Sequence, residues 1–238
     1  MINLSNLLFL DIETVAGEES FTTLSPRFQH LWKHKHHQLL GDEHLNYEAS
    51  YFTRAGIYAE FGKIICIGLG FLMYNENKEL CIKVKVISGD DEKKILENFR
   101  HIIVDKYKNN GPVLCAHNGK EFDYPYLCRR MLIHAMKIPP ILNYQDKKPW
   151  EVKHYDTLAL WKFGDRKAYT SLELLAAVFN IETSKSGIDG SKVNEYYYLK
   201  QALPLIAQYC ARDVVVLIQI FLAMNGINKI ENNNVVYL

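Results

Sequence analysis

The sequence has no Cys-x-x-Cys pair and no large excess of charge of either sign. Its five cysteines are an odd number, and several stand in apolar patterns. We therefore expect reduced core thiols in a cytoplasmic protein rather than a disulfide framework. The formal net charge is only +1, which excludes a globally basic chain. A nucleic-acid partner would need a local basic patch.

Long apolar runs are also missing. The first run, after Asn6, has four residues and no preceding Lys or Arg, so it does not predict a signal peptide. No apolar stretch approaches bilayer-spanning length, and we expect no membrane segment. There are no repeats and no low-complexity linker. With 48% apolar residues the chain can bury a sizeable core, and we expect a single domain over residues 1–238.

Two carboxylates follow the first apolar run. Residues 6–14 predict a short buried strand with an apolar run at 7–10, and the strand ends in Asp11 and Glu13. Residues two apart in a strand point to the same face, so these side chains should project together. Close carboxylates raise one another's pKa unless a cation lies between them, and hard oxygen ligands suit Mg²⁺ or Mn²⁺. A simple charged strand end is the alternative.

The segment at about 15–59 predicts a helical or loop insertion between the first two strands. It is polar and has apolar residues at loosely helical spacing. His30 and His34 are four apart, so one helix face could carry both. No Cys lies nearby, and the intervening lysines favour a basic face that contacts phosphate over a metal site. The histidines of this segment are His30, His34, His36, His37 and His44.

The rest of the pattern predicts an α/β fold. Residues 63–73 are almost wholly apolar, as in a strand covered on both faces, and residues 80–87 alternate, as in an antiparallel edge strand. We expect a mixed, five-stranded sheet with helices on both faces. The remaining expected elements are a helix capped by Ser88 or Asp90 that reaches Tyr107, strands at 113–116 and 152–155, and helices at 125–136, 156–163, 172–179 and 204–224.

Two more acids stand where an element begins or inside an apolar helix. Asp123 lies between a buried strand and a helix that Pro125 opens. Asp213 is four residues after Tyr209 in the last helix, so these two share one face. An acid in so apolar a helix is unfavourable to bury unless it is paired or bound to a metal. Taken alone, Asp123 also fits a helix start and Asp213 a pair with Arg212.

Three other polar residues have competing interpretations. Asp156 follows a strand and fits a helix N-cap better than a metal ligand. His117 is equally suited to a structural role and to a phosphate contact. Asp189 lies in a loop that faces either solvent or substrate.

Taken together, three segments resemble the exonuclease motifs of the DEDD superfamily. The Tyr of the third segment is typical of the DEDDy branch, where the DEDDh branch has a His. The second segment looks most like the proofreading domain of family-B DNA polymerases, and the chain resembles stand-alone bacterial 3′–5′ exonucleases related to that domain. Residues 59–63 and 167–175 also look similar to that group. The segments are Asp11-Ile12-Glu13-Thr14, Asn118-x-x-x-Phe122-Asp123-x-Pro125-Tyr126-Leu127 and Tyr209-x-x-x-Asp213-Val214.

The resemblance implies a ribonuclease H-like fold and a mechanism with two Mg²⁺ or Mn²⁺ ions. It implies that Asp11 bridges both ions, that Glu13 and Asp213 complete the site of the water-activating ion, and that Asp123 holds the second. Tyr209 would orient the attacking water rather than act as a base, because its unperturbed pKa is near 10. The implied contacts to the terminal nucleotide are Thr14, Asn118 and Phe122.

The implied reaction removes one nucleotide at a time from a single-stranded 3′ end and releases a 5′-monophosphate. A preference for an unpaired end is expected on physical grounds, because opening the end of a duplex costs the free energy of base pairing and stacking. The family-B-like motif favours DNA, but no motif identifies a contact to a 2′-OH, so an RNA-trimming exonuclease stays open.

Two further alternatives are weaker. A catalytically silent nucleic-acid-binding module would usually lack one of the acids, and an endonuclease of the ribonuclease H type would not need Tyr209-x-x-x-Asp213. A polymerase domain does not fit in 238 residues. A proofreading role would then be exerted in trans, with a DNA polymerase or a repair complex as partner.

Overall fold

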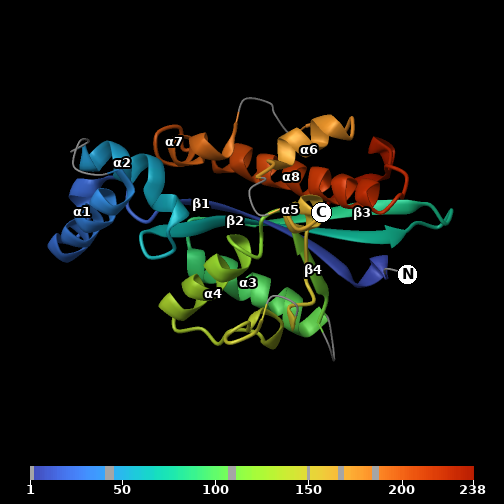
Figure 1. The fold of residues 1–238 in the computed structure, drawn as a ribbon, viewed down its shortest axis with the longest axis horizontal. Coiled ribbons are helices and arrows are strands. Elements are labelled where there is room, and N and C mark those ends of the chain that lie inside the picture. The colour runs from blue at the N-terminus through green and yellow to red at the C-terminus, as the bar shows by residue number, and fades with distance from the viewer. Residues whose placement is uncertain (1–2, 41–45, 107–110, 149–150, 166–168, 184–187) are drawn as a thin grey trace.

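The computed structural model describes residues 3–40, 46–106, 111–148, 151–165, 169–183 and 188–238. Within these residues the strands form one mixed sheet, which Figure 1 shows nearly edge-on between two layers of helices. The strand order is β5-β4-β1-β2-β3-β6. The strands are β1 (Leu7–Ala16), β2 (Gly62–Tyr74), β3 (Leu80–Ser88), β4 (Val113–Ala116), β5 (Tyr155–Asp156) and β6 (Val235–Tyr237).

The α/β class with a mixed sheet and helices on both faces is confirmed, but the expected number of strands is wrong. β1, β2 and β3 pair antiparallel, whereas β4, β5 and β6 join the sheet in parallel. The sixth strand, β6, pairs with the outer side of β3. The expectation that β3 is the edge strand is therefore also wrong. A strand of three residues is too short to show a period in the sequence.

Strand β1 is covered on both faces because its consecutive apolar side chains point alternately to the two faces of the sheet. Leu8, Leu10 and Ile12 pack in one cluster with residues of α3 (Glu92–His101) and α4 (Asp123–Ile133). Leu7 and Phe9 point the other way and pack against α8 (Leu203–Met224). The odd-numbered residues of β1 therefore face α8, which decides where Asp11 and Glu13 point.

Helix α8 matches the expected last helix, with Pro204 in its first turn and Gly226 beyond its end at φ +67°. By length and composition alone it could span a bilayer, so the expectation that no stretch approaches that length is wrong. However, 61% of its most apolar window is buried against the rest of the protein. Burial of this kind is typical of a core helix.

Two glycines of β2 let α8 lie close to the sheet. A Cβ on Gly68 would meet a Val214 methyl at 2.7 Å and the Cys210 Sγ at 2.8 Å, and a Cβ on Gly70 would meet Val214 and Ile218 at 2.6 Å. Any larger residue at these positions would push the helix away from β2. Because Gly68 and Gly70 have no side chain, α8 can pack close to the sheet and therefore close to the acids of β1.

The segment between β1 and β2 forms a small helical lobe of α1 (Pro26–Leu40) and α2 (Tyr47–Arg54). Its centre is Trp32, fully buried with its ring 5.3 Å from that of Tyr51. Trp32 and His36 both hydrogen-bond to the Ser50 hydroxyl, so His36 is a structural residue. The lobe forms the outer end of the molecule in Figure 1.

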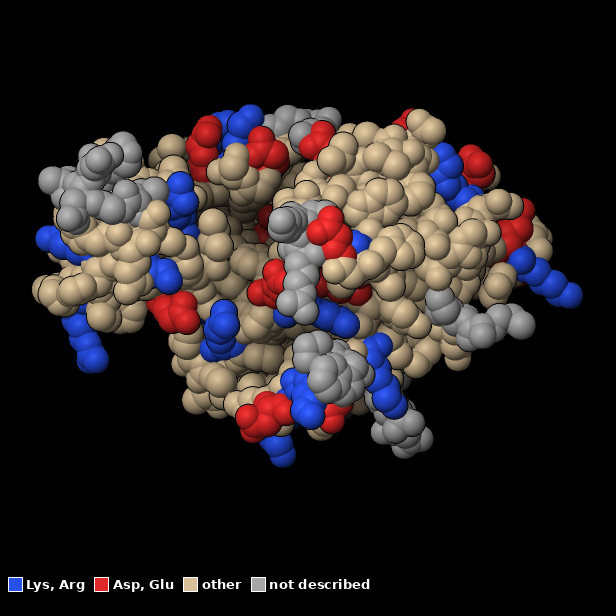
Figure 2. Space-filling view, in the orientation of Figure 1, with Lys and Arg blue, Asp and Glu red and all other residues tan. Residues whose placement is uncertain are grey.

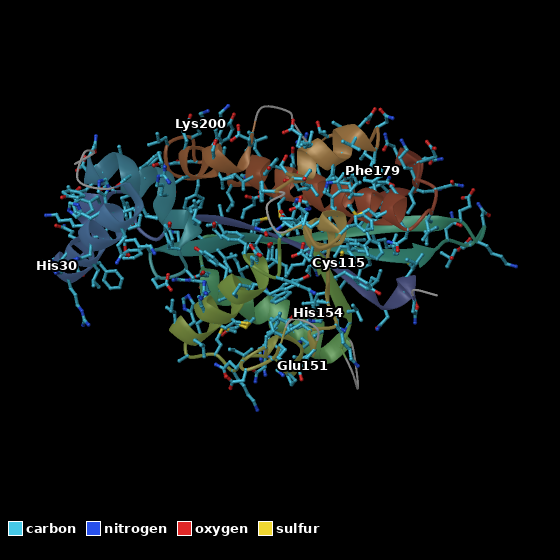
Figure 3. All side chains as sticks on the ribbon, in the orientation of Figure 1. His30, Cys115, Glu151, His154, Phe179 and Lys200 are labelled. Atoms are coloured by element: carbon cyan, nitrogen blue, oxygen red, sulfur yellow. The ribbon has the colours of Figure 1, made fainter. Side chains whose placement is uncertain are left out.

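The histidines of this lobe do not form a metal site among the described residues. The rings of His30 and His34 pack edge to face at 4.7 Å, as their spacing predicts, but no third ligand atom joins them. Figure 3 shows His30 at the far end of the lobe. His44 lies outside the described residues, and the phosphate-contact hypothesis for this face stays a prediction.

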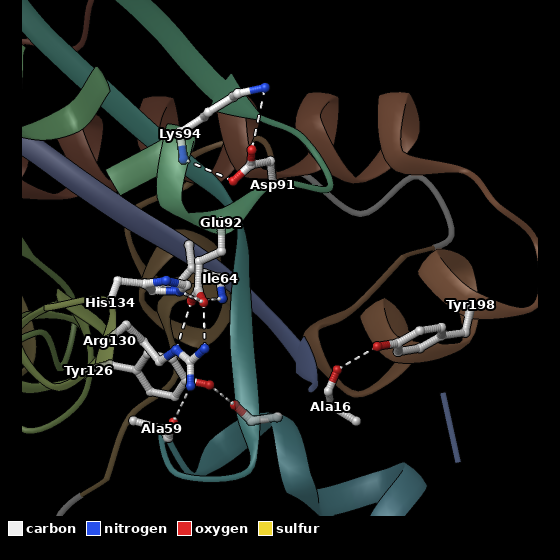
Figure 4. Close-up of polar contacts among 11 residues, drawn as sticks. Ala16, Ala59, Ile64, Asp91, Glu92, Lys94, Tyr126, Arg130, His134 and Tyr198 are labelled. Atoms are coloured by element: carbon white, nitrogen blue, oxygen red, sulfur yellow. Dashed lines mark hydrogen bonds and ion pairs between the residues drawn. The ribbon is translucent and has the colours of Figure 1, made fainter. Parts of the chain in front are cut away.

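A buried ion-pair network ties α3 and α4 to β2 (Figure 4). The Arg130 guanidinium donates to both carboxylate oxygens of Glu92, at 2.8 and 2.5 Å, and to the carbonyl of Ala59 at 2.8 Å. Glu92 also accepts from the Ile64 N–H at 2.7 Å and lies 2.6 Å from His134 Nε2. Burial raises the pKa of Glu92, but these hydrogen bonds outweigh it and leave that pKa lowered.

Smaller differences from the sequence concern element ends. Helix α3 is capped by Asp91 rather than by Ser88 or Asp90, and α4 ends at Ile133 rather than near residue 136. Strand β5 has two residues, fewer than expected. His154, just before it and labelled in Figure 3, accepts from the Leu114 N–H of β4 through one ring nitrogen and bonds to the Ile141 carbonyl through the other. The other helices are α5 (Thr157–Lys162), α6 (Leu172–Val178) and α7 (Val193–Tyr198). Tyr107 and residues 167–168 lie outside the described residues.

All five cysteines are free, and four of them are buried. The expectation of reduced thiols in core positions is therefore confirmed.

Candidate active site

One cleft of about 410 Å³ is lined by all eight residues that the sequence singled out. It opens between the α1–α2 lobe and the carboxyl end of β4, and Figure 2 shows this face hollowed beside acidic side chains. The structure thus brings together residues from the two ends of the chain and from its middle. They are Asp11, Glu13, Thr14, Asn118, Phe122, Asp123, Tyr209 and Asp213.

The first two acids project from within β1, not from its end. Asp11 lies opposite Gly68 of β2 and Glu13 opposite Cys66, and the register shifts immediately after Glu13. The strand then continues to Ala16, so the expectation that it ends at these acids is wrong. Both carboxylates lie on the face that α8 covers, as their spacing predicts.

Helix α8 supplies Tyr209 and Asp213 from one face. Asp213 is 9% exposed, and a hydrogen bond joins it to the Tyr209 hydroxyl. Burial raises the pKa of Tyr209, and the negative charges of Asp213 and Glu13 raise it further. The hydroxyl is therefore a neutral phenol that can donate or accept a hydrogen bond.

Asp123 stands at the start of α4 and is 4% exposed. Its Oδ1 accepts a hydrogen bond from the Ile12 N–H at 3.2 Å, which ties α4 directly to the acid-bearing part of β1. Burial raises the pKa of Asp123 to about 7. This carboxyl is therefore poised to lose its proton when a positive charge arrives nearby.

The donor set fits a divalent cation. Burial is the largest cause that raises the pKa of Asp11, and the negative charges of Asp213 and Asp123 raise it further. Burial also raises the pKa of Glu13, and the charge of Asp11 adds to this effect. Asp11 Oδ2 is buried and has no hydrogen-bond partner. No Lys or Arg lines the cleft within the described residues. Hard oxygen ligands of this kind suit Mg²⁺ or Mn²⁺.

Cys210 is a neighbour of the acids that the sequence did not single out. One ligand atom each of Asp11, Glu13 and Cys210 lie within 4.8 Å of one another. The Cys210 thiol donates to the backbone carbonyl of Asp11 at 3.8 Å and so holds α8 against β1. Its position directly after Tyr209 is the signal that could have found it.

Asn118 is held in the left-handed region, at φ +61°, where Asn is favoured over most residues. Its N–H and that of Lys120 donate to the two carboxylate oxygens of Asp156, both at 3.0 Å. Asp156 also accepts from Leu158 and Ala159 at the start of α5, so the expected N-cap is confirmed. The sequence did not predict that the Asp156 carboxylate also accepts the two N–H groups of the 118–120 turn and so holds its conformation.

We predict that Asp156→Ala destabilises the protein by about 2–3 kcal/mol, because it leaves several buried N–H groups without acceptors. It should also raise the KM for any ligand that Asn118 contacts. Asp91→Ala is the matched control, since Asp91 caps α3 through an exposed bond from the Lys94 N–H and a surface ion pair with the Lys94 side chain. It should cost about 1 kcal/mol and leave KM unchanged. Chemical denaturation and steady-state kinetics measure both. Equal stability losses in the two variants would contradict the prediction.

Two of the predicted cleft residues already have structural partners. The Thr14 hydroxyl donates to the Gly56 carbonyl at 2.8 Å, and the Tyr126 hydroxyl donates to the same oxygen at 2.9 Å. The Phe122 ring packs at 5.4 Å from that of Tyr126. Thr14 and Phe122 therefore fix the wall of the cleft beside the acids.

His117 and Asp189, which the sequence left open, are now placed. The ring nitrogens of His117 bond to the Thr157 hydroxyl at 2.8 Å and the Thr170 carbonyl at 2.9 Å, which favours the structural role. Asp189 accepts from the Ser191 N–H and forms an ion pair with Lys192 at 3.7 Å. It lines a separate depression, of about 300 Å³, that adjoins the cleft.

Sequence reasoning missed the residues that complete the cleft walls. Those from the α1–α2 lobe and α7 stand in segments without a recognisable motif. Tyr169 lies in the 167–175 segment that resembles the exonuclease group, which was the available signal. These additional residues are Phe52, Thr53, Ile57, Tyr169, Ser191 and Asn194.

The fold is similar to that of a much larger protein. A family B DNA polymerase from the hyperthermophilic archaeon Pyrobaculum calidifontis superposes with a TM-score of 0.53 at 13% identity, over 91% of this chain. The chain spans only 24% of the polymerase, and at this identity the likeness shows the fold alone. No curated protein matches the sequence.

The sheet, its covering helices and the acid-lined cleft are those of a ribonuclease H-like domain with the characteristics of a nuclease. A family model described as a predicted 3′–5′ exonuclease related to the exonuclease domain of PolB matches residues 57–234, and the chain belongs to this family. The match includes Asn118, Asp123, Tyr209 and Asp213 but begins after Asp11 and Glu13. The geometry of the cleft alone joins those two acids to the rest.

Proposed function

We propose that the protein is a metal-dependent 3′–5′ exonuclease of the DEDDy branch. It removes nucleoside 5′-monophosphates from the 3′ end of a single strand, with DNA favoured. The observation that carries this proposal is the convergence of acids from β1, α4 and α8, together with Tyr209, in one cleft that has no Lys or Arg in its described lining.

Asp11, Glu13, Asp123 and Asp213 would hold two Mg²⁺ or Mn²⁺ ions. When bound, such ions activate a water molecule and stabilise the charge on the attacking and leaving oxygens. The protein's own part is to keep the four carboxylates close, buried and fixed by β1 and two helices. Because the pKa values of Asp11, Glu13 and Asp123 are raised without a cation, ion binding must release protons.

Tyr209 is assigned to the attacking water as a positioning residue. Tyr209→Phe keeps the ring and removes the hydroxyl that bonds to Asp213. We expect turnover to fall between about 10- and 100-fold, the range found when groups that orient a metal site's ligands are removed. The alkaline limb of the pH profile should not move, because a neutral phenol is not the base. Tyr196→Phe, in the same apolar cluster but outside the cleft, is the control; an alkaline shift specific to Tyr209→Phe would contradict the assignment.

The terminal nucleotide is assigned to the wall formed by Thr14, Asn118 and Phe122. The relation to a polymerase exonuclease domain favours DNA, whereas trimming of RNA 3′ ends is the second candidate on the same cleft. A proofreading or repair role would be exerted in the cytoplasm, in trans to a DNA polymerase or within a repair complex.

The test is digestion of 5′- and 3′-labelled single strands of DNA and RNA of equal length, with Mg²⁺, Mn²⁺ or EDTA. We expect a ladder that shortens from the 3′ end, requires the metal and releases 5′-monophosphates. Comparison of the two ladders gives the preferred sugar. If the protein binds either strand but shortens neither with either metal, it is a binding module and the proposal fails.

A further inference from the structure

A second depression, of about 370 Å³, lies across the 118–121 turn from the acid cleft. Asn118 lines both the acid cleft and this depression, so a nucleic-acid strand that fills the cleft can continue over the turn into the depression. We call it the lysine pocket after Lys120, Lys147 and Lys162, which line it. Its volume lies within the range of pockets that bind small ligands or one nucleotide.

The charge of the lysine pocket is positive. Among the described residues, none of the three ammonium groups has a carboxylate within ion-pair distance. The lining also holds two acids, which offset part of this charge and leave an excess of one positive charge (three lysines against two acids). Asp156 accepts four backbone N–H bonds, and Glu121 is exposed to solvent. Three unpaired lysines around one pocket attract a polyanion.

The floor of the lysine pocket is apolar. Tyr144, half-buried, and Val152 and Leu158 form it, and the Tyr144 ring is braced edge to face by His154 at 5.5 Å. An apolar, aromatic lining beside three lysines suits a ligand that has an aromatic base and a phosphate. Stacking and electrostatic attraction of this kind do not depend on base sequence.

The acid cleft also adjoins a third depression, of about 300 Å³, and its charge is opposite. It shares Tyr169, Tyr209 and Asp213 with the cleft, and its lining carries Glu173 and Asp189 but no Lys or Arg among the described residues. Lys192 pairs with Asp189 but is not part of this lining, so the described residues that line this exit offer a phosphate no Lys or Arg. The described linings of the two exits therefore differ in charge, and the lysine pocket is the one that offers cations to the phosphates of a strand.

We propose that the lysine pocket binds a nucleotide of the substrate strand, on the 5′ side of the terminal nucleotide. The inference rests on the proposed exonuclease function and adds a path for the strand, from the acids over the 118–121 turn. Lys120, Lys147 and Lys162 contact phosphates of that path, and Tyr144 contacts a base. These residues are substrate-binding, not catalytic.

The test is the triple variant Lys120→Ala/Lys147→Ala/Lys162→Ala of the full chain. For a single-stranded 12-mer we expect KM to rise at least tenfold with kcat unchanged within about twofold. In a plot of log binding affinity against log salt concentration, the slope of the triple variant should be less negative than that of wild type by about 2. Each lost phosphate contact in a single strand contributes about 0.7 to this slope. A dinucleotide lacks the upstream phosphates, so its hydrolysis should not change.

The matched control removes three lysines of the β2–β3 hairpin, Lys78, Lys83 and Lys85, which line neither the cleft nor the lysine pocket. It should keep both KM and salt slope. Fluorescence anisotropy of the labelled 12-mer in EDTA measures binding without hydrolysis. If wild type degrades the strand but the two triple variants behave alike, the lysine pocket is not on the strand path and only this inference fails. If wild type hydrolyses nothing, the exonuclease proposal fails, and anisotropy of the two variants still decides whether the lysines bind the strand.

Discussion

Asp11→Asn should lower the rate of nucleotide release by at least about 10³-fold. Removal of one electrostatic group from an active site often lowers the rate by about 10²–10³, and Asp11 lies between the other acids. Its Oδ2 is buried without a partner, so no existing hydrogen bond is lost when the charge is removed. Single-turnover digestion of a 3′-labelled strand in Mg²⁺ and in Mn²⁺ measures the effect.

The same substitution should stabilise the metal-free protein near neutral pH. Burial, then Asp213 and Asp123, raises the pKa of Asp11 well above its ordinary value of 3.8. The folded protein therefore holds this proton more tightly than the unfolded chain, and its stability falls as pH rises above about 4. Asn carries no charge, so the gain in Tm in EDTA should be largest near pH 7.5 and shrink toward about pH 5.

Added Mg²⁺ or Mn²⁺ should raise the Tm of wild type more than that of Asp11→Asn, because binding to the folded state stabilises it. Asp146→Asn is the matched control, since Asp146 is exposed at φ +61°, a conformation that Asn also adopts. The control should keep full activity and the wild-type response to metal. A variant at position 11 with normal digestion, or with a Tm gain that does not depend on pH, would show that Asp11 is not a metal ligand.

Arg130→Ala should cause the largest loss of stability, about 3–5 kcal/mol, because it leaves the Glu92 carboxylate charged, buried and poorly paired. The side chains of Arg130 and Glu92 are 11% and 5% exposed. For a protein of this size the loss corresponds to a fall in Tm of roughly 6–20 °C. The effect should be largest above the ordinary pKa of Glu, because the paired carboxylate has a lowered pKa and stabilises the fold only when ionised.

Arg129→Ala provides the control, because Arg129 is the exposed neighbour on the same helix. It should change the free energy of unfolding by less than about 0.5 kcal/mol. A double variant Glu92→Leu/Arg130→Met should recover much of the loss, since an apolar pair of similar volume avoids the unpaired charge. Urea denaturation of the set measures these differences. A single Arg130→Ala variant as stable as wild type would refute the role of the network.

The sequence predicted the parts of the site that short spacings define. Asp11 and Glu13 share a face because strands have a period of two, and Tyr209 and Asp213 share one because they are four apart in a helix. That these pairs and Asp123 line one cleft follows from long-range packing, which only the resemblance to a family suggested. The roles of these residues stay predictions.

What the sequence could not give depends on contacts between distant segments. The bonds from Asn118 and Lys120 to Asp156 join residues about 40 positions apart, and no local pattern marks them. Strand β6 is too short to show a period, and β1 looked shorter than it is because polar residues interrupt its apolar run. The close approach of α8 at Gly68 and Gly70 likewise becomes visible only when both elements are placed.

The arrangement of the acids across β1, α4 and α8 has a consequence during synthesis. Asp11 emerges from the ribosome about 200 residues before Asp213, an interval of roughly 10–40 s at about 5–20 residues per second. Throughout this time the growing chain lacks α8 and the acid it carries, and β2 presents its glycines to no helix. The proposed site therefore cannot be complete until the last long helix docks against β1 and β2.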